Sequence, residues 1–168
     1  MEGIIVYKTT YGSTKEYAEW ISEDTGFKAV SIANVADLTL DSYDIIIVGG
    51  YVMASKIVIS RWVASHWEQV KDKKVVVFST SGAKPSPEVK KEFLEKSFPP
   101  EIANSIEYFP MHGRRRQQDL SLLGKIMMWI ARTFIAKDAQ EKADMSRDFD
   151  GVDRTYVTPL VEYVKSLG

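Results

Sequence analysis

Short apolar runs that alternate with helical patterns constrain the fold of this chain more than any other feature. Two of them, Ile45–Val48 and Val75–Phe78, are apolar at every position and rich in β-branched residues. Continuous runs of this kind are typical of strands that helices cover on both faces of a parallel sheet. Weaker runs occupy Ile4–Tyr7, Ala29–Ile32 and Ile106–Phe109. The chain is therefore predicted to contain five parallel strands.

Helical patterns separate these strands. Apolar residues recur at helical spacing in Thr14–Asp24, Ile59–Val70 and Val157–Leu167, and Pro87–Ser97 follows a serine suited to a helix start. The pattern is least clear in Asn34–Asp41. This alternation predicts a doubly wound α/β fold with strand order 2-1-3-4-5. Ligands of such a sheet bind beyond the carboxyl ends of the strands, near the switch point between strands one and three.

Composition narrows the class of protein. The chain has 168 residues, 45% hydrophobic and 27% charged, which predicts one globular domain over residues 1–168. The long segment between the fifth strand and the last helix predicts an insert in this domain at about 112–152. It has no cysteine, and its two histidines, His66 and His112, leave little for a metal site, so we expect no metal. The net charge of −1 argues against nucleic acid as a partner. We find no secretory signal and no run long enough to span a membrane, so a cytoplasmic location is expected.

The loop after the first strand carries the strongest motif for binding chemistry. It comprises Thr9, Thr10, Tyr11, Gly12, Ser13 and Thr14, and it opens a predicted helix. A glycine lets the backbone turn towards an anion, the helix N-terminus adds partial positive charge, and the hydroxyls of Thr9, Ser13 and Thr14 can donate hydrogen bonds. The loop contains no lysine or arginine and matches neither G-x-x-x-x-G-K-[ST] nor G-x-G-x-x-G. It is suited to a phosphate held by neutral donors; the alternative is an ordinary turn with a Ser/Thr helix cap.

The sequence T-T-Y-G-S-T resembles the FMN-phosphate loop of flavodoxins, [ST]-x-T-G-x-T, at Thr9, Gly12 and Thr14, with Tyr11 replacing the usual threonine. The order of strands and helices also resembles flavodoxin. The resemblance implies a flavodoxin-like fold with FMN as cofactor. The implied FMN-binding residues come from three loops: Thr9, Thr10, Tyr11, Gly12, Ser13, Thr14, Tyr51, Val52, Met53, Ala54, Thr80, Ser81, Gly82, Ala83 and Lys84.

The two later loops differ in what they could offer a flat ring. Residues 49–55 leave the sheet with small residues, an aromatic ring at Tyr51 and a thioether at Met53, whereas residues 80–84 offer backbone groups and the charge of Lys84. The alternative is that both are ordinary strand-to-helix turns, with Tyr51 in the core. Flavodoxins commonly sandwich the flavin between aromatics from both loops, but Thr80–Pro85 has none. One ring face is then open to a substrate, or something else covers it.

The segment between the fifth strand and the last helix is too long for a simple loop. Residues 110–137 hold six basic residues and one acidic residue, a net charge of +5, which leaves −6 on the rest of the chain. Within it, Leu120–Ile135 is apolar, with Lys125 and Arg132 seven residues apart. This pattern is typical of a basic amphipathic helix on an anionic membrane surface, and it is too short to span a bilayer. The alternative is a helix packed on its own domain.

With this basic insert, the chain is similar to the menaquinone-dependent protoporphyrinogen IX dehydrogenase group. The similarity implies an FMN-dependent oxidoreductase, heme biosynthesis, a tetrapyrrole substrate, a quinone acceptor and peripheral contact with the inner face of the membrane. Arg114, Arg115 and Arg116 would then bind the substrate or the membrane. No residue is predicted to be catalytic. Two alternatives remain: a flavodoxin-type electron carrier that docks a redox partner protein, and a flavin-free α/β regulatory or binding module.

Overall fold

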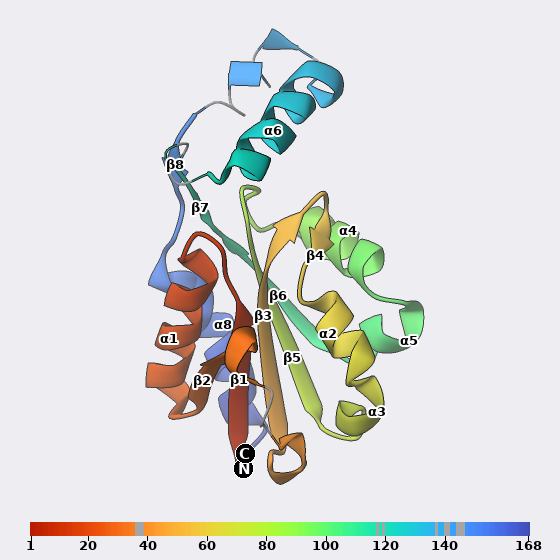
Figure 1. Ribbon diagram of the computed structural model, residues 1–168. Coiled ribbons are helices and arrows are strands. Elements are labelled where there is room, and N and C mark those ends of the chain that lie inside the picture. Colours follow the sequence, from red (N-terminus) through yellow and green to blue (C-terminus); the bar gives the residue numbers. More distant parts are fainter. Residues whose placement is uncertain (36–38, 117, 119, 137, 140–141, 144–146) are drawn as a thin grey trace.

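The computed structural model describes residues 1–35, 39–116, 118, 120–136, 138–139, 142–143 and 147–168 (Figure 1). Its main sheet has the order β2-β1-β3-β5-β6, with all four pairings parallel. Numbered along the chain, these five parallel strands follow the predicted order 2-1-3-4-5, which confirms the fold class. A short β4 pairs antiparallel with the end of β3. The strands are β1 (Gly3–Lys8), β2 (Lys28–Ser31), β3 (Ile45–Met53), β4 (Lys56–Ile57), β5 (Lys74–Ser81), β6 (Glu107–His112), β7 (Arg114–Arg115) and β8 (Phe149–Asp150).

Helices cover both faces of the sheet. The helices of the described residues are α1 (Ser13–Thr25), α2 (Ser60–Ser65), α3 (Trp67–Val70), α4 (Pro87–Ser97), α5 (Pro100–Ala103), α6 (Leu122–Ile130) and α8 (Thr158–Ser166), with shorter turns η1 (Ile32–Asn34), η2 (Leu40–Ser42), η4 (Ala131–Ile135) and η5 (Arg154–Val157). All of the longer helices except α6 lie against the sheet. The prediction of one helix over 59–70 is wrong, because His66 leaves the helical conformation with φ −108° and separates α2 from α3. The uncertain helix at 34–41 corresponds to η1 and η2 in its described part; residues 36–38 lie outside the described residues.

The core consists of two layers, one on each face of the sheet. Because side chains of a strand alternate between faces, Ile4 and Val6 pack with α2, α3, α4 and α5, whereas Ile5 packs with α1 and α8. Both layers consist of apolar side chains, as expected for parallel strands covered on both sides. The continuous apolar runs of the sequence thus have a direct physical cause.

The glycine pair Gly49-Gly50 lies inside β3 and does not end it. A Cβ atom at Gly49 would overlap the ring of Phe78 on β5, and one at Gly50 would lie 2.9 Å from Ile59. The two glycines therefore let neighbouring side chains approach the strand backbone closely. Strand β3 consequently runs on to Met53 and turns back as a hairpin with β4, rather than ending at Val48 as the apolar run suggested.

The insert leaves the domain through β7, which continues from β6, and returns through β8, which pairs with β7 antiparallel. Beyond this pair, α6 and η4 stand past the carboxyl ends of the main strands, at the top of Figure 1. The predicted helix Leu120–Ile135 thus corresponds to an α-helix followed by a π-helical turn. No residue of α6 is buried.

Candidate functional site

The three predicted loops meet at one edge of the sheet. Strand pairing places the end of β1 beside β3, at Lys8 and Gly50, and the end of β3 beside β5, at Tyr51 and Thr80. The loops that follow these strands therefore lie next to one another, at the switch point where ligands bind to this class of fold. A shallow hollow lined by Phe27 and other residues lies at the opposite edge, where the strands begin.

The loop between β1 and α1 is preformed for an anion. Gly12 has a left-handed backbone, φ +88°, and a Cβ atom there would meet nothing within 4 Å, so open space adjoins the loop. The Gly12 N–H donates to Thr9 Oγ1 at 3.1 Å, which fixes the turn. No side chain caps α1, whose first hydrogen bond runs from Glu16 N–H to the Gly12 carbonyl. The first-turn N–H groups thus lack a side-chain cap and can bind an anion.

The hydroxyl groups of this loop also tie it to its surroundings. Thr14 Oγ1 and Thr80 Oγ1 lie 2.9 Å apart and are buried, so they join the first loop to the end of β5. Ser13 Oγ accepts a hydrogen bond from the Arg114 N–H at 3.2 Å. Ser13 and Thr9 each keep a hydroxyl hydrogen that can still be donated to a phosphate oxygen. Thr10 is exposed at the rim of the loop.

Tyr11 brings the insert to the phosphate loop. A Cβ atom at Gly124 in α6 would lie 2.9 Å from the Tyr11 hydroxyl oxygen, so the first turn of α6 packs against this side chain. The sequence gives Tyr11 as an implied FMN-binding residue that replaces the usual threonine, and it does not predict a contact with the insert. The structure shows that this larger residue reaches the insert.

The loop after β3 is a hairpin rather than the ordinary strand-to-helix turn that the sequence left open. Tyr51 and Val52 are half-buried, while Met53 and Ala54 are exposed at its tip. The two central residues, Ala54 and Ser55, have φ of +50° and +61°, a left-handed conformation that residues with a Cβ rarely adopt. Strained backbone of this kind concentrates at functional sites. The hairpin lies beside the loop after β5, because Tyr51 pairs with Thr80.

The loop after β5 receives an aromatic side chain from the insert. Ser81 Oγ accepts from the Ala83 N–H at 3.2 Å and stiffens the loop, and Lys84 is exposed. A Cβ atom at Gly82 would lie 3.1 Å from the ring of Phe149 on β8. Phe149, far away in the sequence, thus places an aromatic ring against a loop that has none of its own in residues 80–85.

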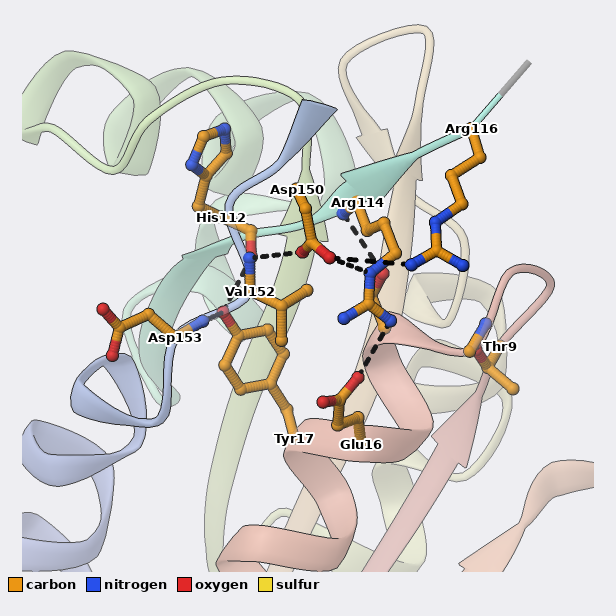
Figure 2. A network of polar contacts seen from close by, with 11 residues as sticks. Thr9, Glu16, Tyr17, His112, Arg114, Arg116, Asp150, Val152 and Asp153 are labelled. Carbon is orange, nitrogen blue, oxygen red and sulfur yellow. Dashed lines mark hydrogen bonds and ion pairs between the residues drawn. The ribbon is translucent and has the colours of Figure 1, made fainter. Parts of the chain in front are cut away.

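The insert leaves the domain at β7 and returns at β8, and we call these two strands the roots of the insert. Arg114 binds two carboxylates at this place (Figure 2). Its Nε donates to Asp150 Oδ2 at 2.6 Å, and one terminal nitrogen donates to Glu16 Oε2 at 3.1 Å. The hydrogen bond to Asp150 raises the pKa of Arg114. Partial burial raises the pKa of Asp150, but the hydrogen bond from Arg114 and a backbone N–H outweigh it and lower the pKa overall. Both groups are therefore charged at neutral pH.

The neighbouring arginines differ from Arg114. The Arg115 guanidinium lies 5.0 Å from the centre of the Phe149 ring. The His112 ring also stacks on Phe149, with ring centres 5.3 Å apart. Arg116 is half exposed and approaches Asp150 at 3.9 Å. The predicted role of these arginines in binding substrate or membrane thus stays a prediction, with Arg116 the most accessible of the three.

Tyr17 links both roots of the insert to α1 (Figure 2). Its hydroxyl donates to the His112 carbonyl at 2.7 Å and accepts from the Asp153 N–H at 3.1 Å. Burial raises the pKa of Tyr17 to about 12, against a smaller lowering by the Asp153 N–H. Sequence reasoning missed the roles of Glu16, Tyr17, Phe149 and Asp150. The polar tip of Tyr17 on an apolar helix face was the one available hint.

Metal binding has no support in the described residues, which contain no cluster of three or more His, Asp or Glu side chains that could hold an ion. Within those same residues, no helix is long and apolar enough to cross a membrane.

A model of the flavodoxin domain matches residues 4–145 of this chain. The chain belongs to the flavodoxin domain family. FMN is thus the cofactor expected at the phosphate loop, and the uncapped α1 and open space at Gly12 fit its phosphate. No curated protein matches the chain.

Several solved structures are similar to this chain. The Trp repressor binding protein from Bacillus subtilis is 13% identical with a TM-score of 0.50, covering 82% of this chain and 99% of that one. The WrbA-like flavodoxin from Agrobacterium tumefaciens is 14% identical with a TM-score of 0.49, covering 98% of each chain. A flavoprotein in complex with FMN from Lactobacillus acidophilus is 18% identical with a TM-score of 0.46, covering 66% of this chain and 91% of that one. At 13% identity, the likeness to the Bacillus subtilis structure concerns the fold alone.

Proposed function

We propose that this flavodoxin domain is an FMN-dependent oxidoreductase of the protoporphyrinogen IX dehydrogenase (quinone) type that works at a membrane surface. The observation that carries the proposal is the position of α6. An apolar, basic helix has its first turn against Tyr11 in the phosphate loop, so the element suited to lipid adjoins the cofactor site. A plain electron carrier has no need of such a helix.

The phosphate loop and α1 would hold the FMN phosphate through backbone N–H groups and the hydroxyls of Thr9 and Ser13. FMN, when bound, supplies the electron-accepting and electron-donating chemistry. The hairpin with Tyr51 and the loop with Gly82 would flank the ring and limit its access to water. Phe149, held against Gly82, adds an aromatic surface beside this region.

The exposed face of α6 supports contact with lipid. Its large apolar side chains are strongly exposed, for example Leu122 at 77%, Trp129 at 61% and, in η4, Phe134 at 75%. An apolar surface of this size on one helix is typical of an interaction site rather than of a solvated helix. Lys125 and Arg132 are also exposed and would meet anionic headgroups. The segment therefore combines the two attractions that hold an interfacial helix on a membrane.

A tetrapyrrole with propionate groups suits the charge of this region. Guanidinium groups match carboxylates in geometry and charge. Because Arg114 already binds Glu16 and Asp150, Arg116 is the better candidate for a propionate. A quinone dissolved in the bilayer would reach the same site from the membrane side, where it would take up electrons and protons and become a quinol.

The first experiment tests cofactor and activity together. The purified protein is loaded with FMN, freed of excess, and supplied with protoporphyrinogen IX and a menaquinone analogue without oxygen, while porphyrin fluorescence is recorded. We expect bound flavin and quinone-dependent porphyrin formation. The Gly12→Asp variant should lose both, because it adds a side chain and a negative charge at the phosphate loop. Gly26→Asp is the matched control, since Gly26 has φ +75° and open space at the other end of α1.

Each other result points to another function. Bound flavin that passes electrons to a redox partner protein, without porphyrin formation, would indicate an electron carrier. A colourless protein that retains no FMN would indicate a flavin-free module and would refute the proposal.

A second experiment tests the membrane. The protein should sediment with vesicles that contain phosphatidylglycerol and less with pure phosphatidylcholine. A variant in which serine replaces both Leu122 and Trp129 should no longer sediment with either kind of vesicle. Equal sedimentation of this double variant and the wild type would contradict a role of α6 in lipid binding.

A further inference from the structure

The roots of the insert and the phosphate loop share one turn of α1. The β7 backbone N–H at Arg114 donates to Ser13, the first residue of that helix, and the Arg114 side chain binds Glu16 one turn further on. On the other root, Asp150 of β8 binds the same guanidinium. Figure 2 shows these side chains converging from α1, β7 and β8 on a single point.

The charges at this point matter for a phosphate. Glu16 lies in the first turn of α1, where its backbone N–H donates to the Gly12 carbonyl. A carboxylate there would repel a phosphate dianion bound at Gly12. Arg114 is the cation that pairs with Glu16, and its side chain is only 21% exposed, so solvent screens the pair less than it would a surface pair.

We propose that Arg114 is a positioning residue that couples binding of the FMN phosphate to docking of the insert. It neutralises Glu16 beside the phosphate and holds β7 and β8 on α1 with the same guanidinium. Phosphate binding and a docked insert therefore stabilise each other, as linkage requires. This inference rests on the proposed FMN site but does not depend on the substrate.

The decisive comparison is between FMN and riboflavin, which share the ring and differ in the phosphate. In Arg114→Gln, Glu16 and Asp150 lose their shared cation, so the FMN dissociation constant should rise about fivefold or more. Riboflavin affinity should change little, because riboflavin carries no phosphate charge. Arg114→Lys should retain most of the FMN affinity, and adding Glu16→Gln to Arg114→Gln should restore it.

Arg154→Gln provides the matched control. Arg154 binds two carboxylates, Glu23 and Asp24, at the opposite end of the same helix, with distances of 2.9 and 2.8 Å. Its loss should leave both flavin affinities unchanged. If Arg114→Gln weakens FMN and riboflavin equally, or weakens neither, the proposal is wrong.

Docking of the insert has its own readout in hydrogen–deuterium exchange. The Gly151 N–H donates to the Gly113 carbonyl at 3.0 Å and reports on the closed root. In the wild type, FMN should slow hydrogen exchange of the peptide around Gly151 more than riboflavin does. In Arg114→Gln, FMN and riboflavin should slow this exchange to the same small extent. Equal slowing by both flavins in the wild type would overturn the coupling. A wild type that binds no FMN would instead refute the proposed function.

Discussion

Replacing Tyr17 by phenylalanine isolates the hydroxyl that joins the insert to α1. The ring is fully buried and would keep its packing, so the change removes only the donor to His112 and the acceptor for Asp153. Each hydrogen bond contributes about 1 kcal/mol net. We therefore expect Tyr17→Phe to lower the free energy of unfolding by about 2 kcal/mol at pH 7, with Tm lower by about 4–8 °C.

The pH dependence of this loss gives a sharper test. The pKa of Tyr17 is raised to about 12 in the folded protein, against about 10 in the unfolded chain. Below pH 10 the hydroxyl is protonated in both states and its stabilisation is complete. Between pH 10 and 12 the unfolded state loses the proton first, so the wild type loses about 1.4 kcal/mol per pH unit from this group. The variant lacks that loss, and its deficit should shrink to below about 1 kcal/mol at pH 11.

The assay is urea unfolding followed by far-UV circular dichroism at pH 7, 10 and 11. Subtracting the variant from the wild type cancels the other titrating groups. Tyr163→Phe is the control: Tyr163 packs against Phe109, and within the described part of the chain its hydroxyl has no hydrogen-bond partner. A deficit for Tyr17→Phe that stays constant from pH 7 to 11 would refute the reasoning.

Three further changes follow from the packing of the site. Gly49→Ala would drive a methyl group into the Phe78 ring, and denaturant unfolding should show a loss of at least about 1–3 kcal/mol. Ala54→Gly would relieve the left-handed backbone at the hairpin tip and should raise the free energy of unfolding by up to about 1 kcal/mol. Thr14→Val should cost about 1–3 kcal/mol by leaving the buried Thr80 hydroxyl without its partner, and a double valine variant should recover part of that loss.

The order of the main strands was predictable from local sequence because the central strands, buried on both faces, are continuous apolar runs. Ile45–Val48 and Val75–Phe78 are apolar on both faces, and both faces are covered. Strand ends were not predictable, since glycines usually read as breaks. Gly49 is instead required by Phe78 on the neighbouring strand, and β3 continues into a hairpin with β4. The need for glycine comes from a contact between β3 and β5, and it produces no recognisable pattern in the sequence of either strand.

The loop after β1 could be predicted as a phosphate-binding site from sequence because its residues are consecutive. The network at the root of the insert could not, since Tyr17 contacts residues 95 and 136 positions away. Glu16 and Asp150 read as ordinary surface carboxylates until the fold brings Arg114 between them. In the sequence the three arginines form a charged triplet. This triplet does not predict that Arg114 binds two carboxylates of its own chain.

The paired roots of the insert also make it a modular part of the chain. The chain leaves at Gly113 and returns at Gly151, where the two backbones are hydrogen-bonded to each other. The segment between Gly113 and Gly151 is therefore a loop whose two ends are held together. Doubling the length of such a loop costs only about 0.6 kcal/mol in closure entropy. The segment between Arg115 and Phe149 can therefore be exchanged for a short turn without altering the strands. A flavodoxin scaffold could gain or lose its apolar helix by a single insertion or deletion at this point.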